Sequence, residues 1–305
     1  MNKIIEAQNS PPMIRLMRAR RRIYQDAEFW QNLQIWLMVF VPALGAALGI
    51  LVPSARPFVA LAAFIATLFD VWLMDPQQKE CNRLAARMTE LFDCAVLELP
   101  WNEFVAGRPL DPEFIERKSR EYKGTDEKLK GWYKPPEIAQ APLPLARVIC
   151  QRQNLWYNGD LRQRGANILA GLAGCLVLGV IVIGVLADMS MVDLTVSLVA
   201  PASPILIWSL RERIRQRDAA AAIDQVKAAA DAFWNTAARS GCPDDAECLR
   251  KSREFQDAIY LRRSSSVLPL PWLYGLFRPK MEVSMGAGAA DRLRQIGVVV
   301  AEPGR

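Results

Sequence analysis

Hydrophobic residues gather in four long runs that are separated by segments rich in charge. The runs cover residues 33–52, 58–74, 168–187 and 194–210. The third run holds twenty residues without a charged or strongly polar side chain. As a helix it would be about 30 Å long, which matches the hydrocarbon thickness of a bilayer. We therefore expect each run to be a membrane-spanning helix.

Short connections join these runs in pairs. Residues 53–57 link the first run to the second, and residues 188–193 link the third to the fourth. Connections this short return the chain to the membrane at once. The sequence thus predicts a mainly α membrane protein with four transmembrane helices, arranged as two hairpins at 33–74 and 168–210.

Positive charge predicts the orientation of the hairpins. Five arginines lie between Arg15 and Arg22, and four more lie between Arg211 and Arg217, whereas the short turns hold only Arg56. Loops rich in arginine stay in the cytosol, so both termini and the middle segment should be cytoplasmic. The alternative for the N-terminal arginines is binding of a nucleotide or an anionic lipid.

Tryptophans support this orientation independently of the charges. Trp30, Trp36, Trp72 and Trp208 would all fall at the cytosolic ends of their spans. Such aromatic belts are typical of membrane–water interfaces.

Three segments should then lie in the cytosol: a basic tail at 1–32, a middle segment at 75–167 and a C-terminal segment at 211–305. Neither of the longer two offers many apolar core positions, so we expect them to form one helical domain together. Apolar spacing predicts helices at 84–95 and 211–239, and we also expect helices at 112–122, 143–164 and 249–263. A short strand at 95–99, a proline-broken aromatic turn at 267–278 and a disordered end at 297–305 complete the expectation.

Small residues four apart mark two candidate helix-packing faces within the spans. Gly45 and Gly49 form one, and Gly171, Cys175 and Gly179 form the other. Small side chains let helix backbones approach closely in lipid. We expect both faces to pack against other helices.

The fourth run is the more polar one and is the candidate pore liner. It carries the hydroxyls of Thr195, Ser197 and Ser203 together with two prolines. Prolines free backbone carbonyls that must be buried in protein or wetted. A kinked packing helix is the alternative. Asp70, near the end of the second run, either lines the pore or anchors its helix at the interface.

Candidate ligand-binding residues cluster just before the third run and near residue 262. Arginines bind phosphates, amides read base edges, and an aromatic ring can stack on a base. The alternative is a solvated helix that binds nothing. The candidates are Arg147, Arg152, Asn154, Trp156, Arg162, Arg262 and Arg263.

Several kinds of chemistry lack their residues in this chain. It contains no histidine, which excludes Ser-His-Asp and Cys-His sites and histidine-containing zinc sites. We find no phosphate-binding glycine loop and no GxSxG motif. The six cysteines are scattered, and Cys242 and Cys248 have no second pair with which to hold a metal. We expect no enzyme, no metal and no cofactor. No cleavable signal peptide precedes the first span.

Five blocks carry a resemblance to a known family. They read QNSPPMIRLMRARRRIYQDAEFWQNLQ, FDCAVLELPWNEFVAGRPLD, LARVICQRQNLWYNGDLRQR, REFQDAIYLRR and PWLYGLFRPKMEVSM. Their order around four spans resembles the SMODS-associated four-transmembrane effectors of bacterial CBASS anti-phage systems. The likeness covers roughly residues 8–290. Tyr157 stands where a second tryptophan is expected, and the last dozen residues carry none of the pattern.

The resemblance implies a mechanism. A partner nucleotidyltransferase makes a cyclic di- or oligonucleotide on infection, and the cytosolic part of the effector binds it. The spans then permeabilise the bacterial inner membrane as a homo-oligomeric pore, which causes abortive infection. The partners are thus the bilayer and the messenger, and no DNA or RNA polymer is expected. A constitutive channel or small transporter, and a membrane-anchored enzyme, are the alternatives.

Overall fold

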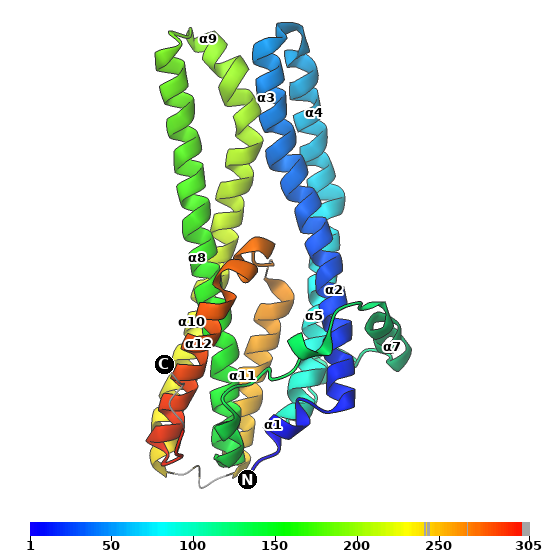
Figure 1. The fold of residues 1–305 in the computed structure, drawn as a ribbon, viewed down its shortest axis with the longest axis vertical. Coiled ribbons are helices and arrows are strands. Elements are labelled where there is room, and N and C mark those ends of the chain that lie inside the picture. Colours follow the sequence, from blue (N-terminus) through cyan, green and yellow to red (C-terminus); the bar gives the residue numbers. More distant parts are fainter. Residues whose placement is uncertain (241, 243–244, 267, 301–305) are drawn as a thin grey trace.

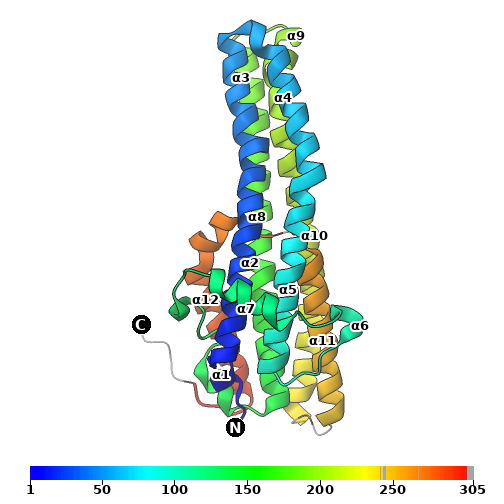
Figure 2. The ribbon, with the colours of Figure 1, turned by 90° about the vertical axis from the view of Figure 1, so that its right-hand side faces the viewer.

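The computed structural model is a long rod of helices (Figures 1 and 2). It describes residues 1–240, 242, 245–266 and 268–300, although the side chains of residues 46, 49, 50, 53, 56, 60, 271 and 274 are not described. These residues contain no β-strand. The predicted strand at 95–99 is therefore wrong, because α5 continues to Val96 and the chain then turns. Of the predicted disordered end, residues 301–305 lie outside the described part.

The helices follow one another through short turns. The first hairpin and its approach comprise α1 (Ile4–Ala7), α2 (Pro11–Ile35), η1 (Trp36–Phe40), α3 (Val41–Leu51), η2 (Pro53–Ala55), α4 (Arg56–Phe69), η3 (Asp70–Met74) and α5 (Asp75–Val96). The middle segment holds α6 (Glu103–Ala106), α7 (Pro112–Glu121), η4 (Asp126–Lys128) and η5 (Pro136–Gln140). The remainder comprises α8 (Leu143–Leu186), α9 (Met191–Leu194), η6 (Thr195–Val199), α10 (Ala200–Ser240), α11 (Asp245–Ser265) and α12 (Pro271–Gln295). The aromatic turn predicted at 267–278 is largely helical, because α12 begins at Pro271.

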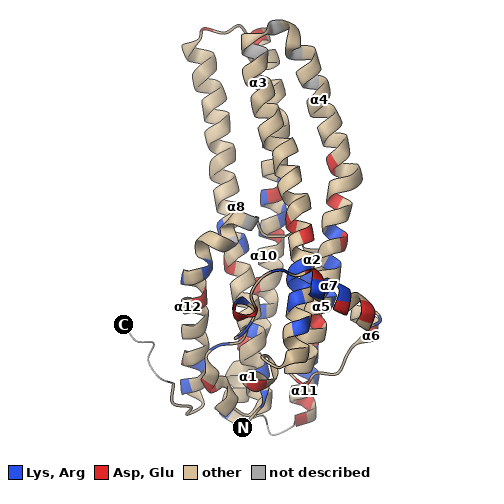
Figure 3. Cartoon of the chain, turned by 45° about the vertical axis from the view of Figure 1, so that its right-hand side comes forward, with Lys and Arg blue, Asp and Glu red and all other residues tan. Residues whose placement is uncertain are grey.

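Charge divides the rod into two halves (Figure 3). The apolar half contains α3, α4, α9 and the adjoining parts of α8 and α10, and it is nearly free of charged residues. The charged half contains α1, α2, α5, α6, α7, α11, α12 and the other ends of α8 and α10.

Among the described residues, three continuous helices are long and apolar enough to cross a membrane. They run over Pro57–Val96, Leu143–Leu186 and Met191–Ser240. The predicted second, third and fourth spans lie within them. The predicted first span, 33–52, lies on the unbroken helical path α2–η1–α3 beside α4 (Figure 1), but it includes residues whose side chains are not described.

The N-terminal arginines are held by partners in the charged half. The predicted tail is helix α2, which packs against α5 and α7. Arg18 pairs with Asp126, Arg22 pairs with Asp26, and Arg20 lies over the rings of Tyr24 and Trp132. These contacts explain the basic run as a packing feature, because each of these three arginines is engaged within the chain.

The two hairpins pack differently. A Cβ atom added at Gly45 would lie 2.5 Å from Val59 Cγ1, so α3 and α4 approach closely there. No atom lies within 4 Å of the corresponding positions at Gly171 and Gly179, and Cys175 is exposed. The second predicted face is thus uncovered within the described part of this chain, and its packing against another helix stays a prediction. Gly49, from the first face, lies outside the described side chains.

One disulfide joins two of the cysteines. Cys242 and Cys248 are bonded across the connection between α10 and α11. The metal site that we considered at these two residues is therefore replaced by a covalent link. The other four cysteines, Cys81, Cys94, Cys150 and Cys175, are free thiols.

Candidate functional site

A polar face of α8 meets α11 and α10 in the charged half and encloses a small pocket. From α8 it is lined by Asn154, Leu155, Asn158 and Arg162; from α10 by Ile223; and from α11 by Ile259, Arg262 and Arg263. The α8 residues recur three or four positions apart, so they lie on one face of the helix. Four of the seven predicted ligand-binding residues, Asn154, Arg162, Arg262 and Arg263, thus come together here.

The pocket is almost closed in this conformation. Its volume is about 20 Å³, which is room for about one water molecule. Arg162 is buried, whereas Arg262 is exposed at the end of α11. A nucleotide can therefore meet Arg262 from solvent, but it reaches Arg162 only if α11 moves away from α8.

Asp93 of α5 lies at the centre of a buried network beside this pocket. Its carboxylate accepts hydrogen bonds from the Tyr133 hydroxyl at 2.6 Å, from Arg263 Nη1 at 2.6 Å and from Gln256 Nε2 at 3.0 Å. Asn154 Nδ2 in turn donates to the Tyr133 hydroxyl at 3.1 Å. Arg263 and Asn154, which line the pocket, are thereby fixed to α5 and the middle segment.

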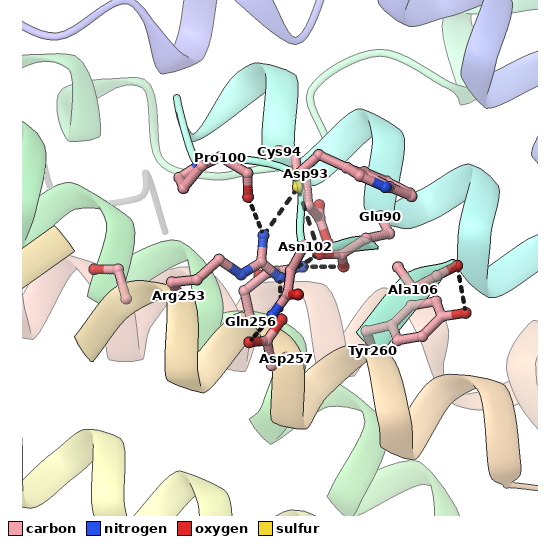
Figure 4. Close-up of polar contacts among 12 residues, drawn as sticks. Glu90, Asp93, Cys94, Pro100, Asn102, Ala106, Arg253, Gln256, Asp257 and Tyr260 are labelled. Carbon is pink, nitrogen blue, oxygen red and sulfur yellow. Dashed lines mark hydrogen bonds and ion pairs between the residues drawn. The ribbon is translucent and has the colours of Figure 1, made fainter. Parts of the chain in front are cut away.

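A second carboxylate, Glu90, one turn before Asp93 on α5, also binds α11 (Figure 4). Glu90 accepts from Gln256 Nε2 at 2.8 Å and pairs with Arg253. Arg253 also donates to the Pro100 carbonyl at 2.8 Å and pairs with Asp257 at 2.9 Å. Buried polar groups of this kind are costly unless all find partners, so the network sets one orientation of α11 against α5.

The electrostatics of the network favour charged arginine and a protonated tyrosine. Burial alone would lower the pKa of Arg263, but the neighbouring Asp93 carboxylate raises it above the ordinary arginine value. Burial, reinforced by the Asp93 charge, raises the pKa of Tyr133 well above its usual range. Arg263 thus remains a cation and Tyr133 a hydrogen-bond donor at neutral pH.

The other three predicted ligand residues lie outside the pocket. Arg147 is buried and donates to the carbonyls of Leu97 and Glu98, at 2.6 and 2.9 Å, so it holds the chain that follows α5. Arg152 pairs with Asp231, a carboxylate that it shares with Arg292. These two arginines are engaged by protein groups.

Trp156, the third of these residues, packs with the buried cluster of Met38, Met74, Leu161 and Trp208 near the boundary between the two halves. It does not line the pocket. This matches the alternative in which the tryptophan serves as a core residue.

The pocket is connected to the boundary between the halves through hydrogen bonds. Arg162 Nη1 donates to Gln216 Oε1 at 2.9 Å, and Gln216 Nε2 donates to the Leu268 carbonyl at 2.8 Å. Gln31 of α2 reaches the same carbonyl at 3.3 Å. Asn82 of α5 donates to the carbonyl of Arg263, in the last turn of α11, at 2.8 Å and to the carbonyl of Ser266, which follows α11. The connection between α11 and α12 is therefore tied to α2, α5 and α10.

Two ion pairs join the first hairpin to α10 at this boundary. Asp70, only 1% exposed, accepts from Gln34 Nε2 at 2.5 Å and from Arg211 Nη2 at 2.6 Å. Asp75 accepts from Arg215 Nη1 at 3.1 Å. The aspartates are five residues apart and face the same way because η3 is a π-turn, in which the Asp75 N–H bonds to the Asp70 carbonyl. The arginines are four apart on α10, so the pairs form a ladder.

The candidate pore-lining hydroxyls do not share one environment. Ser197 is buried and its hydroxyl has no hydrogen-bond partner. Thr195 and Ser203 donate to carbonyls of their own helix, Met191 and Ala200, at 2.7 and 2.8 Å. Hydroxyls satisfied in this way can face lipid. Asp70 is bound in the ladder.

Our sequence analysis missed the acidic side of the site. Glu90 and Asp93 lie three apart on α5, and Ser252, Gln256 and Arg263 recur at i, i+4 and i+11 on α11. That spacing marks one polar helix face. The signal was present, but polar side chains at such spacing ordinarily indicate a solvated face.

Comparison with known proteins agrees with this architecture. The SMODS-associating 4TM effector domain family matches residues 2–292. A protein of Bacillus cereus (strain VD146), described as a probable CBASS effector molecule, is 24% identical over 288 residues, which cover 92% of this chain and 95% of that protein. No solved structure matches. The chain belongs to the SMODS-associating 4TM effector family.

Proposed function

We propose that the pocket between α8, α10 and α11 binds a cyclic nucleotide messenger, and that binding permeabilises the bacterial inner membrane. The observation that carries the proposal is the convergence of three arginines and two asparagines from α8 and α11 on one pocket, at Arg162, Arg262, Arg263, Asn154 and Asn158. Arginine recognises phosphate through two parallel hydrogen bonds, and amides match base edges. The Bacillus cereus relative is described as a probable CBASS effector, so a nucleotidyltransferase of such an anti-phage system would supply the messenger.

The membrane arrangement in this proposal has four spans with both termini in the cytoplasm. The path α2–η1–α3 supplies the first span beside α4, and both the N-terminus and α12, the last described helix, lie in the charged half (Figure 1). The arginines at 15–22 and 211–217 also belong to this half, as the positive-inside rule requires of a cytosolic surface.

A messenger can open the membrane only by binding the open state more tightly than the closed one. The pocket is too small for a nucleotide in this conformation, so binding would require α11 to move from α8. That movement would pull on the Arg162–Gln216–Leu268 contacts and, through α10, on the ladder of Asp70 and Arg211. The proposed coupling between the pocket and the membrane hairpins thus runs through groups in direct contact.

A pore would need several copies of the chain, because one chain supplies few helices with which to enclose a water-filled path. No described part of the chain packs on the Gly171, Cys175 and Gly179 face of α8, so this face is available for a neighbouring copy. The regulatory ligand is the nucleotide, and the proposal includes no catalytic residue.

Binding is tested with purified protein and a panel of cyclic di- and trinucleotides by isothermal titration calorimetry. Arg262 is exposed at the pocket mouth, so Arg262→Ala should leave the fold intact. It should weaken binding by at least about tenfold, because a hydrogen bond to a charged group contributes about 1.5–3 kcal/mol. Arg217→Ala, at an exposed arginine of α10, is the matched control. Equal affinity of the two variants would remove the pocket from the proposal.

Permeabilisation is tested by dye entry into cells that express the protein with or without its partner nucleotidyltransferase. We expect dye entry only with an active synthase, and its loss in Arg262→Ala. Entry without any synthase would favour the constitutive channel. Exclusion in both cases would favour a transporter or an enzyme.

A further inference from the structure

The first turns of α12 form an exposed apolar surface at the boundary between the halves. Trp272 is 47% exposed and Leu276, one turn later, is 62% exposed. Figure 1 shows this part of α12 crossing the side of the bundle just below the apolar half before the helix descends along α8. No other element of the described chain covers these two side chains.

Packing fixes the level of this surface along the rod. Leu273, between the two exposed residues, is buried, and its Cδ1 lies 2.8 Å from the point where a Cβ of Gly165 would stand. Gly165 precedes the apolar run of α8 by three residues. The Arg164 guanidinium lies 5.2 Å from the centroid of the Phe277 ring. The start of α12 is therefore held where the charged part of α8 gives way to its apolar part.

The surface is continuous with the apolar exterior of α8. Gly165, Leu169 and Leu172 are four and three residues apart, so they lie on one face of that helix. Leu169 packs in the same buried cluster as Leu273, and Leu172 beyond it is exposed. Trp272 and Leu276 thus lie beside the lower end of the surface that lipid would cover.

Composition also suits a membrane–water interface. Residues 271–281 include tryptophan, tyrosine and phenylalanine and two cations, of which Arg278 pairs with Glu282 at 2.6 Å and Lys280 is exposed. Aromatic rings prefer the headgroup level, and lysine and arginine near a cytosolic leaflet meet anionic lipid. Amphipathic segments of this kind lie in the interface with the apolar side in the acyl boundary.

We infer that residues 271–278 form an interfacial foot, in which Trp272 and Leu276 insert into the cytosolic leaflet of the bilayer. The foot follows directly from the end of α11 through residues 266–270, so it anchors α11 at the membrane surface. This inference requires the apolar half to lie in a bilayer, but it does not depend on messenger binding or on pore formation.

Photo-crosslinking to lipid tests the foot. The photoreactive residue p-benzoylphenylalanine replaces Trp272 or Leu276 in the full chain, reconstituted in vesicles of phosphatidylethanolamine and phosphatidylglycerol. The same replacement at Leu178, 62% exposed in the apolar half, identifies preparations that are inserted in the bilayer. Phe104, 98% exposed on α6 of the charged half, is the matched control for a solvated aromatic position.

In inserted preparations we expect lipid adducts at positions 272 and 276, detected by mass spectrometry, and at least tenfold fewer at position 104. Adduct yield at 272 and 276 equal to that at 104 would overturn the inference. Adducts of either position to a second copy of the chain, instead of lipid, would also overturn it and would assign the surface to a protein interface.

Discussion

The charged half and the apolar half share the long helices α8 and α10, yet different forces hold them together. In the charged half, helices are joined through buried polar contacts such as those of Asp93 and Glu90, within a large apolar core. In the apolar half, exposed leucines and valines face outward, and α3 and α4 approach closely at Gly45. The comparison indicates that directional polar contacts fix the arrangement of the charged half, whereas close helix packing at a small residue holds α3 and α4 together in the apolar half.

The largest effect should come from the Asp93 network. Asp93→Ala would leave Arg263 as a buried charge without its carboxylate, and breaking a buried pair costs about 3–5 kcal/mol. We expect a strong loss of thermal stability, measured as the unfolding midpoint in detergent. Asp218→Ala, at an exposed position of α10, should change little. Equal midpoints for the two variants would contradict a charged half held together by its polar interior.

The next largest effect on stability should come from the ladder of ion pairs at the boundary. Asp70→Asn removes the charge that Arg211 meets, and a hydrogen bond to a charged group contributes about 1.5–3 kcal/mol. We expect a moderate loss of stability and, under the proposed function, dye entry without a synthase. Glu80→Gln, at an exposed position of α5, is the control. Wild-type stability of Asp70→Asn would show that the ladder does not join the hairpins.

A matched pair of glycine substitutions compares the hairpins themselves. Gly45→Leu would overpack α3 against Val59, and overpacking costs about 1–3 kcal/mol. Gly179→Leu has open space in its own chain, so the stability of the monomer should change by less than about 0.5 kcal/mol. Thermal unfolding in detergent measures both. If Gly179→Leu instead caused a large loss of stability, and if that loss disappeared under conditions that keep the chain monomeric, the face would be a contact between copies.

The smallest effect is expected at Ser197. Its buried hydroxyl lacks a hydrogen-bond partner, so Ser197→Ala should leave stability unchanged or raise it by about 1 kcal/mol. Single-channel recording then decides whether the hydroxyl lines a pore, because only a pore-lining group would change the conductance. Thr195→Val, at an exposed hydroxyl bonded within its own helix, is the comparison.

Much of the helical architecture could be predicted from the sequence because its signals are local. The helices predicted at 84–95, 112–122, 143–164, 211–239 and 249–263 correspond to α5, α7, α8, α10 and α11. For 84–95 and 211–239 the signal was apolar spacing, which marks the buried face of a helix. The strand at 95–99 failed because a run of a few apolar residues does not distinguish the end of a buried helix from a strand. The turn at 267–278 failed because proline is also compatible with the first turn of a helix, as at Pro271.

The predicted site residues show the same difference between what is local in the sequence and what depends on the fold. Asn154, Arg162, Arg262 and Arg263 could be selected from residue type, and they do meet at one pocket. Arg147 and Arg152 are the same residue type on the same helix, yet backbone carbonyls and Asp231 engage them. Residue type states what a side chain can bind, and only its neighbours in space decide what it does bind.

The sequence by itself determined the helical class, the apolar runs and the family, because periodicity, length and residue order are properties of the chain alone. Tertiary structure decided which charges are neutralised, which small-residue face is covered and how the pocket reaches the boundary. Asp70 shows the reason. As a lone carboxylate near the end of an apolar run it had two interpretations, and Arg211, 141 residues away along the chain, reaches it only when the hairpins pack together.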